Sequence, residues 1–194
     1  MRVIIAIAIT LGGCVRDPAE TFCPEVVLGD LAVTEVRAQP SGDTLGSWVE
    51  VYNASGHPLD LRGVELRFRK MDGTSETKVI VRRSLPLAAG AYAVLGRVTD
   101  DELRPSFVDY GFAADFPAAW PSAAALDINA CGELIDRVTY SSLPTMGSYS
   151  LGAMPPSASA NDFPAMWCTD ATPVGAGYPG TPRQPNIACP VTIQ

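Results

Sequence analysis

Apolar and polar residues alternate along much of the chain, most regularly at residues 64–69, where Val64, Leu66 and Phe68 are separated by charged residues. Alternation with a period of two is typical of a β-strand that has one face buried and the other in water. Similar short stretches occur at residues 31–36, 48–53, 78–83, 91–95, 125–128, 133–140 and 148–151. Turn sequences such as Asp72-Gly73 separate them, which is typical of antiparallel hairpins.

This spacing of about seven to nine short strands predicts an all-β fold, an antiparallel β-sandwich. At residues 48–53, Val49 and Val51 are expected to face the core. Residues 113–125 have a mildly helical composition, but Pro117 and Pro121 limit any helix there to a short turn. Residues 155–194 are rich in Pro and Gly, so we expect an irregular C-terminal strap packed on the domain.

The N-terminus reads as a targeting sequence. Arg2 precedes an apolar run at residues 3–11, which is too short to span a bilayer and is typical of a signal peptide. The following Leu11-Gly12-Gly13-Cys14 resembles a bacterial lipobox. We therefore predict a lipoprotein signal peptide over residues 1–13, lipidation of Cys14, a tether over residues 14–29 and a β-sandwich over residues 30–154. By analogy with bacterial lipoproteins, Val15 favours the outer membrane.

Four cysteines follow the lipobox: Cys23, Cys131, Cys168 and Cys189. An even number of cysteines in an exported chain predicts two disulfides. Three pairings are open, and the one we favour joins Cys23 with Cys189, near the two ends of the mature chain, and Cys131 with Cys168.

The charge and the motif content of the chain argue against nucleic-acid binding and against several classes of enzyme. The net charge of −7 argues against nucleic acid as a partner, because phosphate binding needs an excess of cations. The single histidine, His57, lies in a Gly-His-Pro turn, and the chain contains no Gly-x-Ser-x-Gly elbow, no P-loop and no Gly-x-Gly-x-x-Gly motif. We expect no catalytic residues and no cofactor, and hence not an enzyme.

Three carboxylates are candidates for a calcium site. Glu35 and Glu50 are expected on neighbouring strands, with Asp60 nearby, and Ca²⁺ prefers oxygen ligands. Paired carboxylates are also the residues that a glycan hydrolase uses. The structural alternative is that they accept hydrogen bonds from turns and from exposed arginines.

Residues 62–83 hold seven of the fourteen Lys and Arg residues and only three acids. A candidate patch for an anionic ligand consists of Arg67, Arg69, Lys78 and Arg82. Such a patch would suit an anionic polysaccharide or an acidic protein. The alternative is a solvated strand face whose charges protect the sheet from edge-to-edge association.

Several blocks together resemble the bacterial lamin tail domain. They are residues 34–36 (TEV), 48–53 (WVEVYN), 59–63 (LDLRG), 87–95 (LAAGAYAVL), 135–140 (IDRVTY) and 180–186 (GTPRQPN). The resemblance extends over about residues 30–187, although residues 105–125 depart from the usual pattern. It implies an immunoglobulin-like β-sandwich in exported or surface proteins and implies no catalytic residues.

We therefore expect a non-catalytic, lipid-anchored lipoprotein of the cell envelope with a binding or structural module. The first alternative is a calcium-supported surface adhesion module. The second, less favoured alternative is a glycan hydrolase. The expected partners are the membrane, through the N-terminal lipid, and an envelope protein or anionic polysaccharide.

Overall fold

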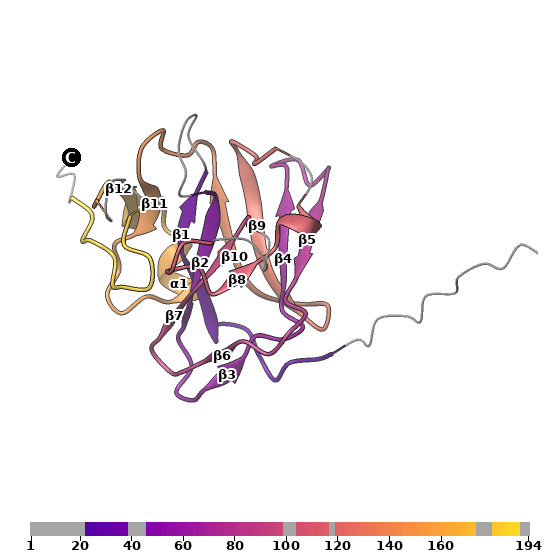
Figure 1. Cartoon of the computed structure of the whole chain (residues 1–194). Helices are drawn as coiled ribbons and strands as arrows, with labels where there is room; N and C mark the ends of the chain where they lie inside the picture. Colours follow the sequence, from indigo (N-terminus) through magenta and orange to yellow (C-terminus); the bar gives the residue numbers. More distant parts are fainter. Residues whose placement is uncertain (1–21, 39–45, 99–103, 117–118, 174–179, 191–194) are drawn as a thin grey trace, which may run out of the picture.

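The computed structural model describes residues 22–38, 46–98, 104–116, 119–173 and 180–190. In these residues the regular secondary structure is mostly β-strand, with several antiparallel sheets and only short helical turns (Figure 1). The prediction of an all-β fold is therefore confirmed. Residues 1–21, with the predicted signal peptide and Cys14, lie outside the described residues. Within the described part, no helix is long and apolar enough to cross a membrane.

The larger sheet has six strands in the order β12-β11-β1-β2-β7-β8. Its strands are β1 (Leu31–Arg37), β2 (Trp48–Asn53), β7 (Tyr92–Gly96), β8 (Tyr110–Gly111), β11 (Ser148–Leu151) and β12 (Trp167–Asp170). Neighbouring strands are antiparallel except β7 and β8, which are parallel.

The second sheet has four antiparallel strands in the order β10-β9-β4-β5. They are β4 (Glu65–Arg69), β5 (Thr77–Ile80), β9 (Ala124–Ala130) and β10 (Glu133–Tyr140). A third, two-stranded sheet joins β3 (Leu59–Asp60) to β6 (Pro86–Leu87). The helical turns are η1 (Ala113–Asp115), α1 (Ala158–Asn161) and η2 (Pro164–Met166).

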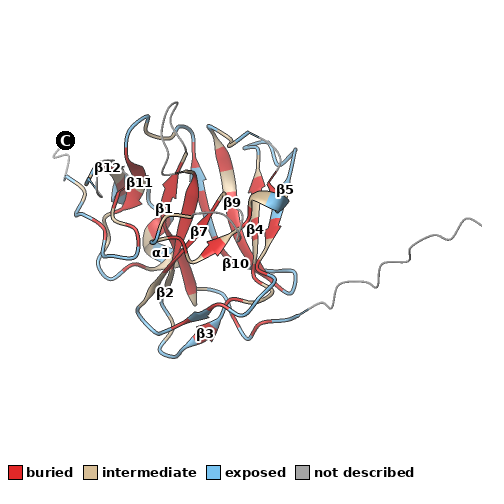
Figure 2. Cartoon of the chain, in the orientation of Figure 1, coloured by how far each residue is buried: buried red, intermediate tan, exposed pale blue. Residues whose placement is uncertain are grey.

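Both large sheets contribute to one hydrophobic core. Val33 and Val49 from the six-stranded sheet belong to the same buried cluster as Leu66 and Ile128 from the four-stranded sheet. Buried residues are concentrated on the strands (Figure 2). Each such side chain contributes roughly 1.5–3 kcal/mol of hydrophobic free energy on burial.

The predicted strand faces are largely correct. In β4, Leu66 and Phe68 are buried while the charged residues between them remain partly exposed. In β2, Val49 and Val51 face the core, as predicted. The opposite face of β2 is also covered: Trp48 is buried in a separate cluster, and Glu50 is completely buried.

The described part of residues 105–125 contributes an aromatic cluster to the core. Phe112, Phe116 and Trp120 pack against Phe68 of β4 or against one another, with ring centroids 5.0–6.4 Å apart. Among the described residues of the predicted stretch 113–125, the only helical turn is η1.

The C-terminal strap is more regular than expected, because it adds β12 to the edge of the six-stranded sheet. It also contains α1, which is capped at its N-terminus by Ser157, whose Oγ accepts a hydrogen bond from the Ala160 N–H. Residues 180–190 return to the same sheet, where Asn186 Nδ2 donates to the main-chain oxygens of Thr34 and Leu151.

The four cysteines form two disulfides, as predicted, but the favoured pairing was wrong. Cys23 is bonded to Cys131, and Cys168 is bonded to Cys189. The β9–β10 turn places Cys131 beside the tether. Because β12 pairs with β11, Cys168 lies opposite Ser150, close to where the strap returns. Closing loops of 108 and 21 residues stabilises the fold by about 5 and 3 kcal/mol on the chain-entropy model.

Candidate functional site

Glu35 and Glu50 face one another across β1 and β2, and both side chains are completely buried. The register of the two strands shifts between Val33 and Glu35, which is a β-bulge. Because of this bulge, Val33 and Val36 both face the core, although they are three positions apart. Glu35 and Glu50 lie on the other side of the sheet, beneath the strap. We call these two residues the carboxylate pair.

Glu35 is held by neutral donors from β11 and the strap. Its Oε1 accepts hydrogen bonds from the hydroxyls of Ser148 and Ser150, the latter at 2.6 Å, and from the Thr181 N–H at 3.1 Å. Its Oε2 is buried and has no hydrogen-bond partner among the residues that the structure describes. The hydrogen bonds to this carboxylate are therefore all made by Oε1.

Glu50 is also held without a cation. Its Oε1 accepts from the Thr34 hydroxyl at 2.8 Å, and its Oε2 accepts from the Arg183 N–H at 2.5 Å. In the described part of the chain, neither Glu35 nor Glu50 forms an ion pair with a Lys or Arg side chain. The pair thus has five donors but no compensating positive charge.

Burial without a counter-charge changes the titration of the pair. Desolvation raises the pKa of Glu35 to about 7. Desolvation, followed by repulsion from Glu35, raises the pKa of Glu50 well above its usual value. Two ionised carboxylates that are buried side by side would repel one another strongly, because the dielectric constant of the interior is low. Burial and mutual repulsion therefore both favour the protonated, neutral form of the pair over the doubly ionised form.

Residues 180–186 of the strap, which we call the closing segment, cover the carboxylate pair. Gly180 has a φ of +106°, and a Cβ at this position would lie 2.2 Å from both Glu35 Oε1 and Ser148 Oγ. Thr181 Oγ1 donates to Asp170 Oδ2 at 2.9 Å. The closing segment can approach the pair this closely because glycine has no side chain.

A second buried polar connection joins the two sheets. Asp136 of β10 accepts hydrogen bonds from the Val33 N–H and from Asn161 Nδ2, both at 2.7 Å. Asn161 Nδ2 also donates to the Val33 main-chain oxygen. Desolvation raises the pKa of Asp136 to about 6. Sequence analysis missed this connection, although the three-residue spacing of the core residues Ile135 and Val138 indicates the bulge that turns Asp136 inward.

The third calcium candidate lies elsewhere. Asp60 is an exposed residue of β3 that accepts hydrogen bonds from the Arg62 N–H, the Leu85 N–H and the Ser84 hydroxyl. The structure therefore brings Glu35 and Glu50 together but does not add Asp60 to them. Among the residues it describes, no group of three or more His, Cys, Asp or Glu residues is arranged to hold a metal ion.

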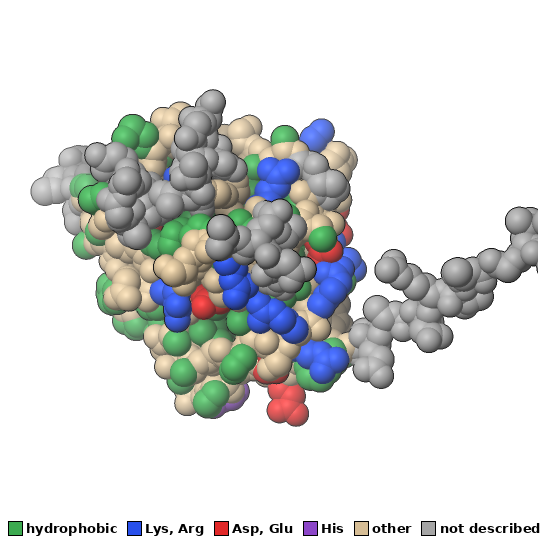
Figure 3. All heavy atoms as spheres, in the orientation of Figure 1, with side chains coloured by type: hydrophobic (Ala, Val, Ile, Leu, Met, Phe, Trp, Pro, Cys, Tyr) green, Lys and Arg blue, Asp and Glu red, His purple; other side chains and the backbone are tan. Residues whose placement is uncertain are grey.

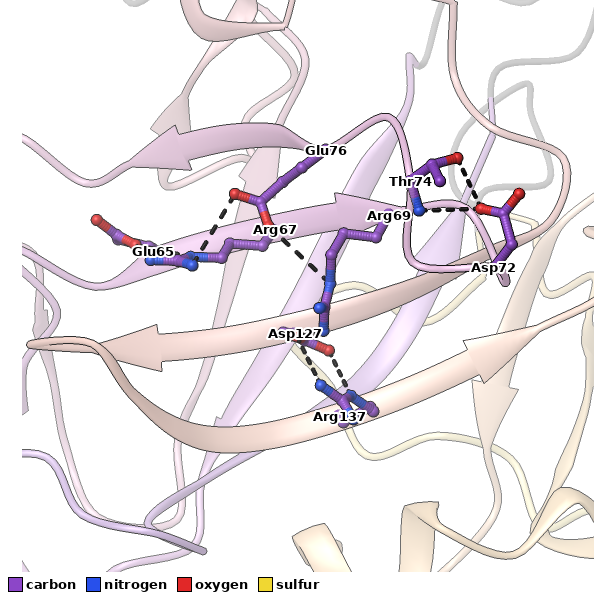
Figure 4. Close-up of polar contacts among 8 residues, drawn as sticks. All are labelled: Glu65, Arg67, Arg69, Asp72, Thr74, Glu76, Asp127 and Arg137. Atoms are coloured by element: carbon purple, nitrogen blue, oxygen red, sulfur yellow. Dashed lines mark hydrogen bonds and ion pairs between the residues drawn. The ribbon is translucent and has the colours of Figure 1, made fainter.

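The predicted anionic-ligand patch lies on the four-stranded sheet and beside it, and its cations are paired with acids. Arg67 and Lys78 both bind Glu65, at 2.6 and 3.2 Å. Arg69 binds Asp127, and Arg82 binds Asp115. Figure 4 shows Arg69 and Arg137 converging on Asp127 from the strands on either side of β9. We call Glu65, Arg67, Arg69, Asp127 and Arg137 the charged face.

Lys and Arg side chains are also spread over the face of the molecule seen in Figure 3. Each of the four predicted patch residues nevertheless has a carboxylate partner. An anionic ligand would have to compete with these acids. The geometry therefore favours the interpretation of the patch as a solvated strand face.

Two polar residues lie in or beside the loop between β2 and β3. Asn53 is buried, and its Oδ1 accepts from the Ser55 N–H while its Nδ2 donates to the main-chain oxygens of His57 and Leu87. His57 itself is exposed in the turn. Both residues therefore belong to the architecture of the loop between β2 and β3.

Comparison with protein-family models finds no matching family, and comparison with curated proteins finds no matching sequence.

Proposed function

We propose that this chain is a lipid-anchored lipoprotein of the bacterial outer membrane, with an immunoglobulin-like β-sandwich that serves as a non-catalytic binding or structural module. The observation that carries the proposal is that the cysteines after Cys14 are all disulfide-bonded. All four cysteines after the lipobox are joined in two disulfides, which suits an oxidising compartment outside the cytoplasm. The fifth, Cys14, stands at the position where a lipobox cysteine is acylated.

The arrangement of the sheets supports the immunoglobulin-like part of the proposal. Two large sheets share one core, and most neighbouring strands are antiparallel. The blocks that resemble the lamin tail domain lie mainly on central strands, including β1, β2 and β7, and in the closing segment. The resemblance thus involves residues that interact in space.

The non-catalytic role is supported by the position of the carboxylate pair. Glu35 and Glu50 have no exposed surface, and the closing segment lies directly over them. A substrate would have to displace that segment before it reached either side chain. Hydrogen bonds from the Thr181 and Arg183 N–H groups give the pair a structural task, which is to fix the strap to the sheet.

The proposed partners are the membrane, through the lipid on Cys14, and an envelope protein. An anionic polysaccharide is the less favoured ligand because Arg67, Arg69, Lys78 and Arg82 are already paired with acids. The calcium alternative is weakened because Asp60 lies apart from the carboxylate pair.

The test is to express the full chain in a bacterium with radiolabelled palmitate and to measure the mass of the mature protein. We expect cleavage before Cys14, a labelled product whose mass increases by that of the attached lipid, and recovery in the membrane fraction. The matched control is Cys14→Ser, which should be unlabelled. An uncleaved and unlabelled wild-type chain would contradict the proposal.

A further inference from the structure

Three large apolar side chains are exposed where the chain enters the domain. Val27 and Leu28, in the turn before β1, are 65% and 77% exposed, and Leu134, at the start of β10, is 37% exposed. The Gly29 N–H donates to the Ile135 oxygen at 3.1 Å, which joins the turn to β10 next to Leu28 and Leu134. We call Val27, Leu28 and Leu134 the apolar tip.

A disulfide fixes the tether close to the apolar tip. Cys23 is bonded to Cys131, three residues before Leu134, so the tether cannot move independently of β10. Eight residues separate Cys14 from Cys23. Even a fully extended chain of this length spans only about 30 Å. A lipid on Cys14 would therefore hold the apolar tip close to the membrane surface.

We propose that the apolar tip rests on the lipid bilayer and orients the domain on the membrane. This inference depends on the proposed lipid anchor. Because the anchor keeps the domain at the surface, the second contact is effectively intramolecular, and a weak apolar contact is enough to select one orientation. Exposed apolar side chains partition into the interface of a bilayer, where their contact with water is reduced.

The charges around the apolar tip indicate the kind of lipid surface. Glu25 and Glu133 are both exposed, and each lies two residues or fewer from a member of the apolar tip. Carboxylates are repelled by anionic headgroups and are attracted to the ammonium groups of zwitterionic ones. The partner that fits this surface is therefore a bilayer rich in zwitterionic lipid.

The experiment uses Leu28→Trp in the full, lipidated protein, reconstituted on phosphatidylethanolamine and phosphatidylcholine vesicles with brominated acyl chains. Bromine quenches indole fluorescence only at close range, so a tryptophan at the bilayer should lose at least half of its added emission. The three native tryptophans provide a background that is subtracted with the wild-type protein. Leu28 is largely exposed, so tryptophan should fit without disturbing the core.

The matched control is Met71→Trp, because Met71 is 58% exposed but lies at the other end of the four-stranded sheet. In that sheet, Arg69 pairs with Ala125 and Glu65 with Asn129, so the hairpin at Met71 and the Cys131 turn are at opposite ends. Quenching of Leu28→Trp without quenching of Met71→Trp supports the inference.

Equal quenching of the two variants, or quenching of neither, overturns the inference. If the protein still floats with the vesicles in that case, the lipid anchor stands and only the orientation is rejected. If the protein does not float, both the anchor and the orientation are rejected. A Leu28→Trp signal that depends on protein concentration rather than on bromine would assign the apolar tip to a second copy of the chain, which also overturns the inference.

Discussion

Glutamates occupy two contrasting regions of this molecule. The carboxylate pair lies beneath the closing segment, where only neutral N–H and O–H groups contact it. On the charged face, Glu65 is partly exposed and accepts hydrogen bonds from Arg67 and Lys78. The same residue type thus connects a strap to a sheet in one place and balances cations in the other.

The titration of the two regions differs in direction. Desolvation raises the pKa of Glu35 to about 7. Desolvation also raises the pKa of Glu65, but the hydrogen bonds from Arg67 and Lys78 outweigh it, so that the pKa lies below its usual value. The comparison teaches that the presence of a cation, together with the depth of burial, decides whether a buried acid stabilises the fold as an ion or as a neutral group.

The largest expected loss of stability comes from Gly180→Ala, which pushes the closing segment away from the carboxylate pair. The new Cβ would meet Glu35 Oε1 and Ser148 Oγ at 2.2 Å, and the φ of +106° is unfavourable for alanine. We expect a loss of about 3 kcal/mol or more in the free energy of unfolding, measured by denaturant titration.

The matched control for that variant is Gly73→Ala in the hairpin beside the charged face. Gly73 has a φ of +80°, but no atom lies within 4 Å of its added Cβ. Only backbone strain remains, so the expected loss is about 1 kcal/mol. Equal losses in the two variants would mean that the closing segment does not pack tightly on the carboxylate pair.

The second effect is a fall in stability with rising pH. A raised pKa in the folded state contributes stability that is fully present below pH 4.5 and is lost as the pH rises through about 7. For Glu35 alone this loss is on the order of 3 kcal/mol. Asp136 contributes in the same direction between pH 3.8 and about 6.

Glu50→Gln tests the origin of this pH dependence, because its amide can accept from the Arg183 N–H and donate to the Thr34 hydroxyl. We expect the fall in unfolding free energy between pH 5 and 8 to become smaller, with the contributions of Glu35 and Asp136 remaining. Glu65→Gln is the control, since the lowered pKa of Glu65 affects stability only as the pH falls below 4.5. An unchanged pH profile in Glu50→Gln would show that the pair is not the source.

The smallest effect belongs to the charged face. Arg69→Ala leaves Asp127 with Arg137, which binds it through two hydrogen bonds of 2.7 and 3.0 Å. Partly exposed ion pairs contribute roughly 0–1 kcal/mol and are screened by salt. We therefore expect a loss below about 1 kcal/mol by denaturant titration, which becomes smaller in high salt. A loss as large as that of Gly180→Ala would place the charged face among the determinants of the fold.

Sequence analysis predicted the strands well and the contacts between distant segments poorly. The alternation at residues 64–69 is a local property, and β4 follows it. The placement of Glu35 and Glu50 on neighbouring strands was also correct. The contacts of the closing segment with these two residues could not be predicted, because Thr181 lies 146 residues from Glu35 and Arg183 lies 133 residues from Glu50.

The same reasoning explains the basic patch and the cysteines. The local excess of cations at residues 62–83 was real, but Asp127 and Asp115 lie 58 and 33 residues from their arginine partners. Counting charges in a sequence window therefore overestimated the free positive charge. The pairing of Cys168 with Cys189 depended on β12, a strand that the Pro- and Gly-rich composition of the strap had concealed.

By itself, the sequence determined where most of the strands form, which residues of the alternating strands face the core and where the chain turns between them, because these properties depend on neighbours within a few positions. Only the tertiary structure decided which cysteines bond, which acids meet cations and which acids are buried without them. The physical reason is that Coulomb interactions and desolvation depend on distances in space, and folding brings together groups that are far apart along the chain.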